Sequence, residues 1–189
     1  MRRASKGVLD PVAGFLLKIG LTPNAVTILG LVITVGGAVL AGMGKFTLAV
    51  VVLLIGAPLD AVDGAMARKL GSPTRFGGFL DSVLDRYAEL SMMGGLLFYY
   101  MNQGNSLDGL LIFIAAAGSV MVSYTRARAE GLGFNGKGGL LGRIERMILM
   151  ILFLLIRRPM IAILIIAVLA NFTAIQRVLL VHKQAVDTK

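Results

Sequence analysis

Long apolar runs separated by short polar breaks dominate the chain. Six apolar stretches can be drawn, at residues 25–43, 46–59, 79–100, 110–124, 147–156 and 160–181. A helix needs about 20 residues to cross the hydrocarbon core of a bilayer. The second stretch must therefore extend to near Arg68 and the fifth must begin near Leu140. The pattern predicts an all-α integral membrane protein with six transmembrane helices, two of which carry charged residues to membrane depth.

The segment before the first run predicts a different kind of helix. Residues 1–21 have only a short apolar stretch and no cleavage pattern of a secretory signal, so we expect an amphipathic juxtamembrane helix. Thr22 suits the N-cap of the first membrane helix and Pro23 suits its first position. No break is long enough to separate a soluble domain. The chain is therefore predicted to be one membrane domain, with the juxtamembrane segment at 1–21 and the six-helix bundle at 22–184.

Composition agrees with a bilayer environment. Apolar residues make up 57% of the chain, charged residues only 15%, and the mean hydropathy is +0.83. A soluble domain needs far more charged surface than this. The absence of cysteine excludes thiolate metal sites and disulfides, and the single histidine, His182, argues against a histidine-based site.

The distribution of basic residues predicts both partners and orientation. The net charge is +9, but Lys and Arg gather at the ends of apolar runs rather than in one stripe, which favours lipid headgroups and phosphates over nucleic acid. Lys45, Arg157 and Arg158 fall on one side of the predicted helices, and the other 16 basic residues are assigned to the opposite side. Both termini are therefore expected in the cytoplasm, at the cell membrane.

Four of the ten acidic residues fall within 26 positions. They follow the pattern Asp60-x2-Asp63-Gly64-x2-Ala67-Arg68-x8-Gly77-x3-Asp81-x3-Asp85. Spacings of three and four residues put each pair of aspartates on one face of a helix. A short turn around Gly71, Ser72 and Pro73 can bring the two helices, and hence both pairs, together.

Carboxylates that converge near a bilayer repel one another unless cations neutralise them. Hard divalent ions such as Mg²⁺ or Mn²⁺ fit an all-oxygen site, and two of them about 4 Å apart can clamp the oxygens of a phosphoryl transfer. Gly64 lets a phosphate or nucleotide approach the backbone, and Arg68 offers a bidentate donor to phosphate oxygens. Two other interpretations are open: structural pairing of the aspartates with Arg68, Arg75 and Arg86, or a divalent-cation transport site.

The spacing resembles the signature of the CDP-alcohol phosphotransferases, D-x2-D-G-x2-A-R-x8-9-G-x3-D-x3-D, at every defined position. The resemblance extends over essentially the whole chain and includes the Thr22-Pro23-Asn24 entry to the first membrane helix. It implies six transmembrane helices, a homodimer, and transfer of a substituted phosphate from a CDP-linked donor to an alcohol, with release of CMP.

Residue roles follow from the same resemblance. Asp60, Asp63 and Asp81 would ligate two Mg²⁺ or Mn²⁺ ions, and Asp85 would contact the second ion and act as general base toward the acceptor hydroxyl. The CDP-linked donor, CDP-diacylglycerol or an ether-lipid equivalent, would contact the following residues: Asn24, Asp60, Gly64, Ala67, Arg68 and Gly77.

The acceptor is suggested by the segments from Ser123 to Glu130 and from Arg143 to Arg146, which are rich in arginine. They resemble the S-Y-x-[KR]-A-R-A-E and R-x-E-R segments of phosphatidylinositol-phosphate synthases and their archaeal relatives, which implies inositol 1-phosphate as the acceptor. The candidate ligands of its phosphate are Ser123, Arg126, Arg128, Arg143 and Arg146.

Two alternatives to this acceptor site remain open. Glycerol 3-phosphate would use the same donor and metals. Arg128 could instead form a surface pair with Glu130, and Arg143 and Arg146 could simply follow the bias of basic residues toward the cytoplasm.

Overall fold

The computed structural model of the chain describes residues 2–71 and 74–187. These residues form eight α-helices, which confirms the all-α prediction. The helices are α1 (Arg2–Lys18), α2 (Pro23–Gly42), α3 (Phe46–Gly56), α4 (Leu59–Lys69), α5 (Arg75–Met101), α6 (Ser106–Gly131), α7 (Arg143–Leu155) and α8 (Pro159–Asp187). Ser72 and Pro73, predicted within the turn between the two aspartate pairs, lie outside the described residues.

Four segments of the described chain are long and apolar enough to cross a membrane. They are Pro23–Gly42, Phe46–Lys69, Ser106–Gly131 and Pro159–Asp187. These correspond to four of the six predicted membrane helices, so the chain has the character of a multi-pass membrane protein. The remaining two predicted spans coincide with α5 and α7, and their crossing of the membrane stays a prediction.

Two predicted helix boundaries differ in detail. The second predicted helix is interrupted at Ala57 and Pro58, so it consists of α3 and α4. Proline has no N–H to continue the hydrogen-bond ladder, which explains an interruption here. The fifth was expected to begin near Leu140, but α7 begins at Arg143 and has 13 residues.

The start of α2 has the predicted cap. Thr22 is extended, with φ −90° and ψ 154°, and its Oγ1 accepts a hydrogen bond of 3.2 Å from the Ala25 N–H. Pro23 occupies the first helical position, where its missing N–H has no structural consequence. The polar triplet Thr22-Pro23-Asn24 thus fixes where the first long apolar helix begins.

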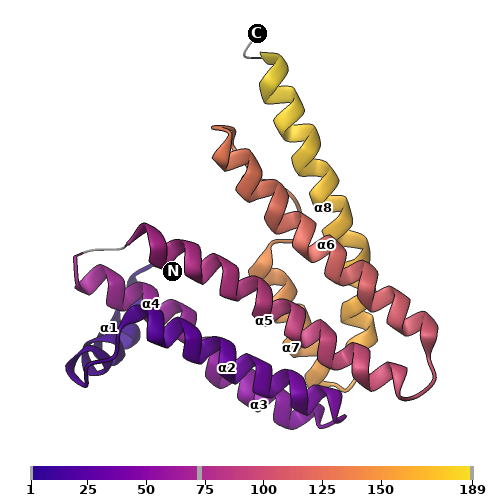
Figure 1. The fold of residues 1–189 in the computed structure, drawn as a ribbon, viewed down its shortest axis with the longest axis horizontal. Helices are drawn as coiled ribbons and strands as arrows, with labels where there is room; N and C mark the ends of the chain where they lie inside the picture. The colour runs from indigo at the N-terminus through magenta and orange to yellow at the C-terminus, as the bar shows by residue number, and fades with distance from the viewer. Residues whose placement is uncertain (1, 72–73, 188–189) are drawn as a thin grey trace. The chain divides into compact units, whose positions relative to one another are not determined.

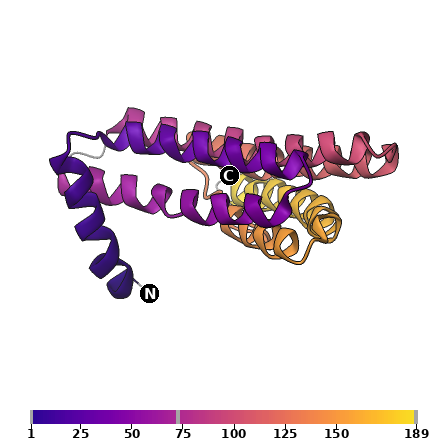
Figure 2. The ribbon, with the colours of Figure 1, turned by 90° about the horizontal axis from the view of Figure 1, so that it is seen from below.

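The chain divides into two compact units, one up to Gly95 and one from Leu96. In the first unit α2 packs against α3 and α4, and α1 packs against α4 (Figure 1). Figure 2 shows α1 running across the direction of α2. In the second unit α8 packs against both α6 and α7.

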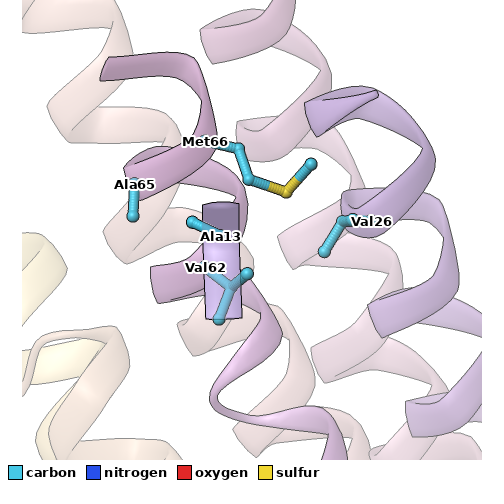
Figure 3. Packing of buried hydrophobic residues seen from close by; sticks show 5 residues of the cluster. All are labelled: Ala13, Val26, Val62, Ala65 and Met66. Carbon is cyan, nitrogen blue, oxygen red and sulfur yellow. The ribbon is translucent and has the colours of Figure 1, made fainter. Parts of the chain in front are cut away.

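A small apolar cluster joins α1, α2 and α4 in the first unit. Met66 and Val62 on α4 meet Val26 on α2 and Ala13 on α1 (Figure 3). Met66 and Ala13 are fully buried. Because α4 also carries Asp60 and Asp63, this packing fixes the helix from which the first aspartate pair projects.

Gly95 on α5 marks a close approach to α2. A Cβ added at Gly95 would lie 2.9 Å from the carbonyl carbon of Ala38, whereas one added at Gly94 would meet nothing within 4 Å. We expect Gly95→Ala to destabilise the protein by about 1–3 kcal/mol, because backbone must move to admit the methyl group. The matched control Gly94→Ala should be neutral or stabilising by about 0.5–1 kcal/mol through its higher helix propensity. Thermal unfolding in detergent measures both, and equal melting temperatures for the two variants would contradict the close packing.

Candidate metal and substrate site

The first aspartate pair lies on α4. Asp60 falls in the first turn of the helix, just after the interruption at Pro58, and is half-buried. Asp63, one turn later, is only 7% exposed. The interruption thus allows a new helix to begin with an acidic residue in its first turn, where the helix dipole favours a negative charge.

The second pair lies one helical turn apart on α5. Asp81 is half-buried, and Asp85 is only 7% exposed. Burying a carboxylate is costly unless charges or hydrogen bonds compensate. The burial of Asp63 and Asp85 therefore calls for a specific compensating partner at each.

Three of the four aspartates converge. One carboxylate oxygen from each of Asp60, Asp81 and Asp85 lies within 4.8 Å of the others. Oxygens on a single octahedral Mg²⁺ lie about 3–4 Å apart, since each bond is about 2.1 Å long. The cluster is therefore close to the size that a hard divalent ion requires, and its donors are all oxygens.

Asp63 differs from the other three. The Thr27 hydroxyl on α2 donates a hydrogen bond of 2.6 Å to Asp63 Oδ2. Because a carboxylate can accept several bonds, this contact is compatible with metal ligation through the same side chain. The ligand role of Asp63 stays a prediction, and Thr27 is a partner that the sequence did not indicate.

Arg86 provides a charge partner for Asp85. Its Nη2 lies 3.3 Å from Asp85 Oδ2, with 29% of the arginine side chain exposed. This is one of the contacts expected if the aspartates were structural. A pair between neighbours in sequence gives no reason, however, for Asp60 on another helix to join Asp81 and Asp85.

The residues predicted to bind the CDP-linked donor form two groups. A Cβ added at Gly64 would lie 3.3 Å from Arg68 Nη1, so the glycine lies directly beside the guanidinium. A Cβ added at Gly77 would lie 3.3 Å from Asn24 Oδ1. Ala67 is half-buried on the same helix as Gly64 and Arg68. Small residues thus lie next to polar side chains at both places, while their contact with a nucleotide stays a prediction.

The predicted acceptor residues lie in the second unit and have unequal environments. Arg126 and Arg128 are exposed, and Arg126 Nε forms an ion pair of 2.9 Å with Glu130. Glu130 thus pairs with Arg126, whereas a surface pair with Arg128 was the alternative. Ser123 Oγ donates to the Ser119 carbonyl at 3.3 Å, which is a bond within α6.

Arg143 and Arg146 begin α7. Arg143 is half-buried, and Arg146 is only 2% exposed and donates from Nη1 to the Leu141 carbonyl at 3.3 Å. Simple preference for cytoplasmic loops does not explain an arginine this deeply buried. A surface role is therefore excluded for Arg146.

Arg177 on α8 is a buried cation that the sequence analysis missed. It is 7% exposed, and it donates from Nε to the Gly138 carbonyl at 2.8 Å and from Nη1 to the Val122 carbonyl. The available signal was a single arginine inside the last apolar stretch, since ionisable residues within membrane helices are rare and usually have a specific role.

The profile of the family described as CDP-alcohol phosphatidyltransferase matches residues 20–181. The chain belongs to this family. The match includes all four aspartates and both arginine-rich segments, so the enzyme class predicted from the signature is confirmed. Membership also favours a transferase over the transport site considered above.

Curated relatives of this phosphatidyltransferase include proteins named for inositol phosphate. It is 41% identical to the phosphatidylinositol phosphate synthase of Mycobacterium marinum over 79% of this chain, which corresponds to 65% of the length of that relative. It is 36% identical to the archaetidylinositol phosphate synthase of Pyrococcus horikoshii over 94% of this chain and 93% of the relative.

Solved structures of the phosphatidylinositol phosphate synthase of Mycobacterium tuberculosis share the fold. The structure with CDP-DAG bound superposes with a TM-score of 0.87 at 34% identity, covering 92% of this chain and 93% of that one. The structure in complex with manganese and citrate gives a TM-score of 0.88, covering 92% and 88%. The phosphatidyltransferase thus has the fold of a membrane enzyme whose structure has been solved with a CDP-lipid and with a divalent metal.

Proposed function

We propose that this phosphatidyltransferase makes a phosphatidylinositol phosphate, or its archaeal ether-lipid counterpart. The donor is CDP-diacylglycerol or the ether-lipid equivalent, the acceptor is inositol 1-phosphate, and the second product is CMP. The observation that carries the proposal is the convergence of Asp60, Asp81 and Asp85 from two helices of a CDP-alcohol phosphatidyltransferase. The names of the relatives support inositol phosphate as the acceptor.

The four aspartates are the proposed metal ligands. Asp60, Asp63, Asp81 and Asp85 would hold two Mg²⁺ or Mn²⁺ ions. Ions bound there would supply positive charge next to the phosphate oxygens of the substrate. Manganese bound to a relative with the same fold supports this chemistry.

Asp85 removes the proton from the acceptor hydroxyl. As that oxygen bonds to the phosphorus that bears the lipid, the bond from this phosphorus to the oxygen of the CMP phosphate breaks, and CMP leaves with the electron pair. Asp85 is only 7% exposed, so its carboxylate is largely kept from bulk water, which would compete with the acceptor hydroxyl.

Donor and acceptor are held by different parts of the chain. Asn24, Gly64, Ala67, Arg68 and Gly77 bind the CDP group together with Asp60, with Arg68 directed to a phosphate oxygen. The phosphate of the acceptor is bound by the arginine-rich segments. The proposed ligands of this phosphate are Ser123, Arg126, Arg128, Arg143 and Arg146.

The topology is proposed from the same helices. Six helices cross the membrane, both termini and the metal site face the cytoplasm, and the enzyme is a homodimer. α1 lies along the membrane surface: Ala13 is buried against α4, whereas Val12 and Phe15 are exposed at 42% and 61%, and Ile19, just after the helix, at 57%. An apolar face of this kind suits the boundary between headgroups and lipid tails.

The experiment is a CMP-release assay with purified enzyme, CDP-diacylglycerol or its ether-lipid counterpart, and competing acceptors. We expect kcat/KM for inositol 1-phosphate to exceed that for glycerol 3-phosphate by at least about a hundredfold, because polar groups that bind the ring hydroxyls of inositol would have no partner on the smaller acceptor. Preferential use of glycerol 3-phosphate would reject the acceptor while leaving the family chemistry intact.

A further inference from the structure

Three polar side chains occupy one stripe of α8. Thr173, Arg177 and Gln184 are separated by four and seven residues, so they lie on one face of the helix. We refer to these three residues as the α8 stripe. Polar residues on a face of a largely apolar helix require partners, and each member of the stripe has one in the connection between α6 and α7, residues 132–142.

Thr173 and Arg177 bind the second half of this connection. Thr173 is fully buried, and its Oγ1 accepts a hydrogen bond of 3.1 Å from the Leu141 N–H. Arg177 Nε donates to the Gly138 carbonyl at 2.8 Å. Two consecutive turns of α8 therefore hold backbone groups three residues apart in the connection.

Gln184 binds the first half with two bonds. Its Oε1 accepts from the Asn135 N–H at 2.8 Å, and its Nε2 donates to the Asn135 carbonyl at 3.0 Å. A side-chain amide that satisfies both backbone groups of one residue reproduces the pairing between two strands. It fixes the position and the orientation of Asn135 together.

Gly139 shows how closely the connection lies on α8. Its φ of +100° is a conformation that residues with a side chain rarely adopt, and a Cβ there would overlap the methyl group of Thr173. The connection thus has both a special backbone conformation and a continuous set of bonds to one helix face.

Leu141 links the stripe to the arginines of α7. Its N–H is held by Thr173, and its carbonyl accepts from Arg146 Nη1 at 3.3 Å. Arg143 follows Leu141 by two residues and is the first residue of α7. The position of Leu141 therefore sets both the start of α7 and the place of the buried Arg146 guanidinium.

We propose that the α8 stripe, through Thr173 and Gln184, positions Arg143 and Arg146 for the phosphate of the acceptor. The inference rests on the proposed function, because it gives those arginines their ligand. Thr173 and Gln184 are positioning residues: they bind backbone and act on the acceptor only through the arginines. A purely structural role predicts a different outcome, namely equal effects on donor and acceptor together with lower stability.

The test uses two isosteric variants of the full chain, each with a matched control. Thr173→Val removes the acceptor of the Leu141 bond, and Gln184→Met removes both bonds to Asn135. Thr47→Val and Gln103→Met make the same changes at exposed positions. Thr173→Ser retains the hydroxyl and serves as the rescue variant.

We expect Thr173→Val and Gln184→Met each to raise the KM for inositol 1-phosphate about fivefold to tenfold, the loss of one or two hydrogen bonds that fix the arginines. The KM for the CDP-lipid should change less than twofold, Thr173→Ser should restore the acceptor KM, and both controls should match the wild type. Hydrogen exchange of residues 133–142 should be faster in Thr173→Val and Gln184→Met.

Faster exchange in this segment with an unchanged acceptor KM would overturn the positioning role. Equal rises in the KM values for inositol 1-phosphate and for the CDP-lipid would also overturn it, because they indicate general damage to the enzyme. If Thr173→Val fails to fold, Gln184→Met still tests the positioning role. If the wild type uses another phosphorylated alcohol in place of inositol 1-phosphate, the proposed acceptor fails, and the same comparison of KM values with that alcohol tests the stripe separately.

Discussion

Asp85→Asn is expected to lower kcat by about a thousandfold, since general-base catalysis contributes about 10²–10⁴ in rate and the amide cannot accept the proton. The substitution keeps the size of the side chain and also removes one of the three converging carboxylates. CMP release at saturating donor, acceptor and Mn²⁺ measures the effect. Saturating metal keeps the loss of the base from being confused with weaker ion binding.

The matched control is Glu89→Gln, one turn further along α5 and outside the converging group. It makes the same change from acid to amide, and we expect kcat within about twofold of the wild type, as for substitutions away from a reacting centre. Asp85→Asn also removes the ion pair with Arg86, so melting temperatures of both variants must accompany the rates. A well-folded Asp85→Asn enzyme with kcat within fivefold of the wild type would contradict the base role.

Removal of divalent metal should have an effect of comparable size. Treatment with EDTA is expected to lower turnover at least about a hundredfold, because bound ions contribute several kcal/mol to the stabilisation of charge in the transition state. Addition of Mn²⁺ or Mg²⁺ in excess over the chelator should restore it. The measurement is CMP release before chelation, after it and after re-addition of metal.

The same treatment should also alter stability. Without a cation the converging carboxylates repel one another, so EDTA should lower the melting temperature of the wild type. In Asp81→Asn, which has one fewer charge in the group, the shift should be smaller. Full turnover in the presence of excess EDTA would contradict a metal-dependent mechanism.

Sequence periodicity predicted most of the helices because the signal is local. The cap of α2 followed from Thr22 and Pro23 alone, since both act on the first turn of their own helix. The interruption at Pro58 was missed because apolar residues continue on both sides of it, and hydropathy does not register the missing N–H. Length and composition identify four spans directly, but not α5, whose polar first half carries the second aspartate pair.

The convergence of the acidic residues was also open to prediction. Helical spacing places Asp81 and Asp85 on one face, and only a short turn was predicted between their helix and the helix that carries Asp60. The contact between Thr27 and Asp63 was not predictable in this way, since it joins residues 36 positions apart on different helices. Which hydroxyl meets a given carboxylate depends on how the helices pack, and spacing along one helix contains no such information.

The residues predicted to bind the acceptor show more strongly that sequence does not reveal tertiary contacts. The sequence indicated Arg126, Arg143 and Arg146 by their clustering, but it did not distinguish the exposed Arg126 from the buried Arg146. It also gave no indication that α8 holds the connection before α7, because Thr173 and Gln184 bind backbone groups 32 and 49 positions away. Nearly every residue has a backbone N–H and a carbonyl, so the type of residue does not show which backbone group a side chain will bind.

The most direct test of the proposed metal site is the location of Mn²⁺ by anomalous scattering in crystals of the enzyme grown with manganese. We expect two peaks about 4 Å apart, coordinated by the carboxylates of Asp60, Asp81 and Asp85, with Asp63 completing the set. Both peaks should vanish in crystals of Asp81→Asn. Manganese bound elsewhere in the chain, or an active enzyme whose four aspartates bind no ion, would contradict the proposed metal site.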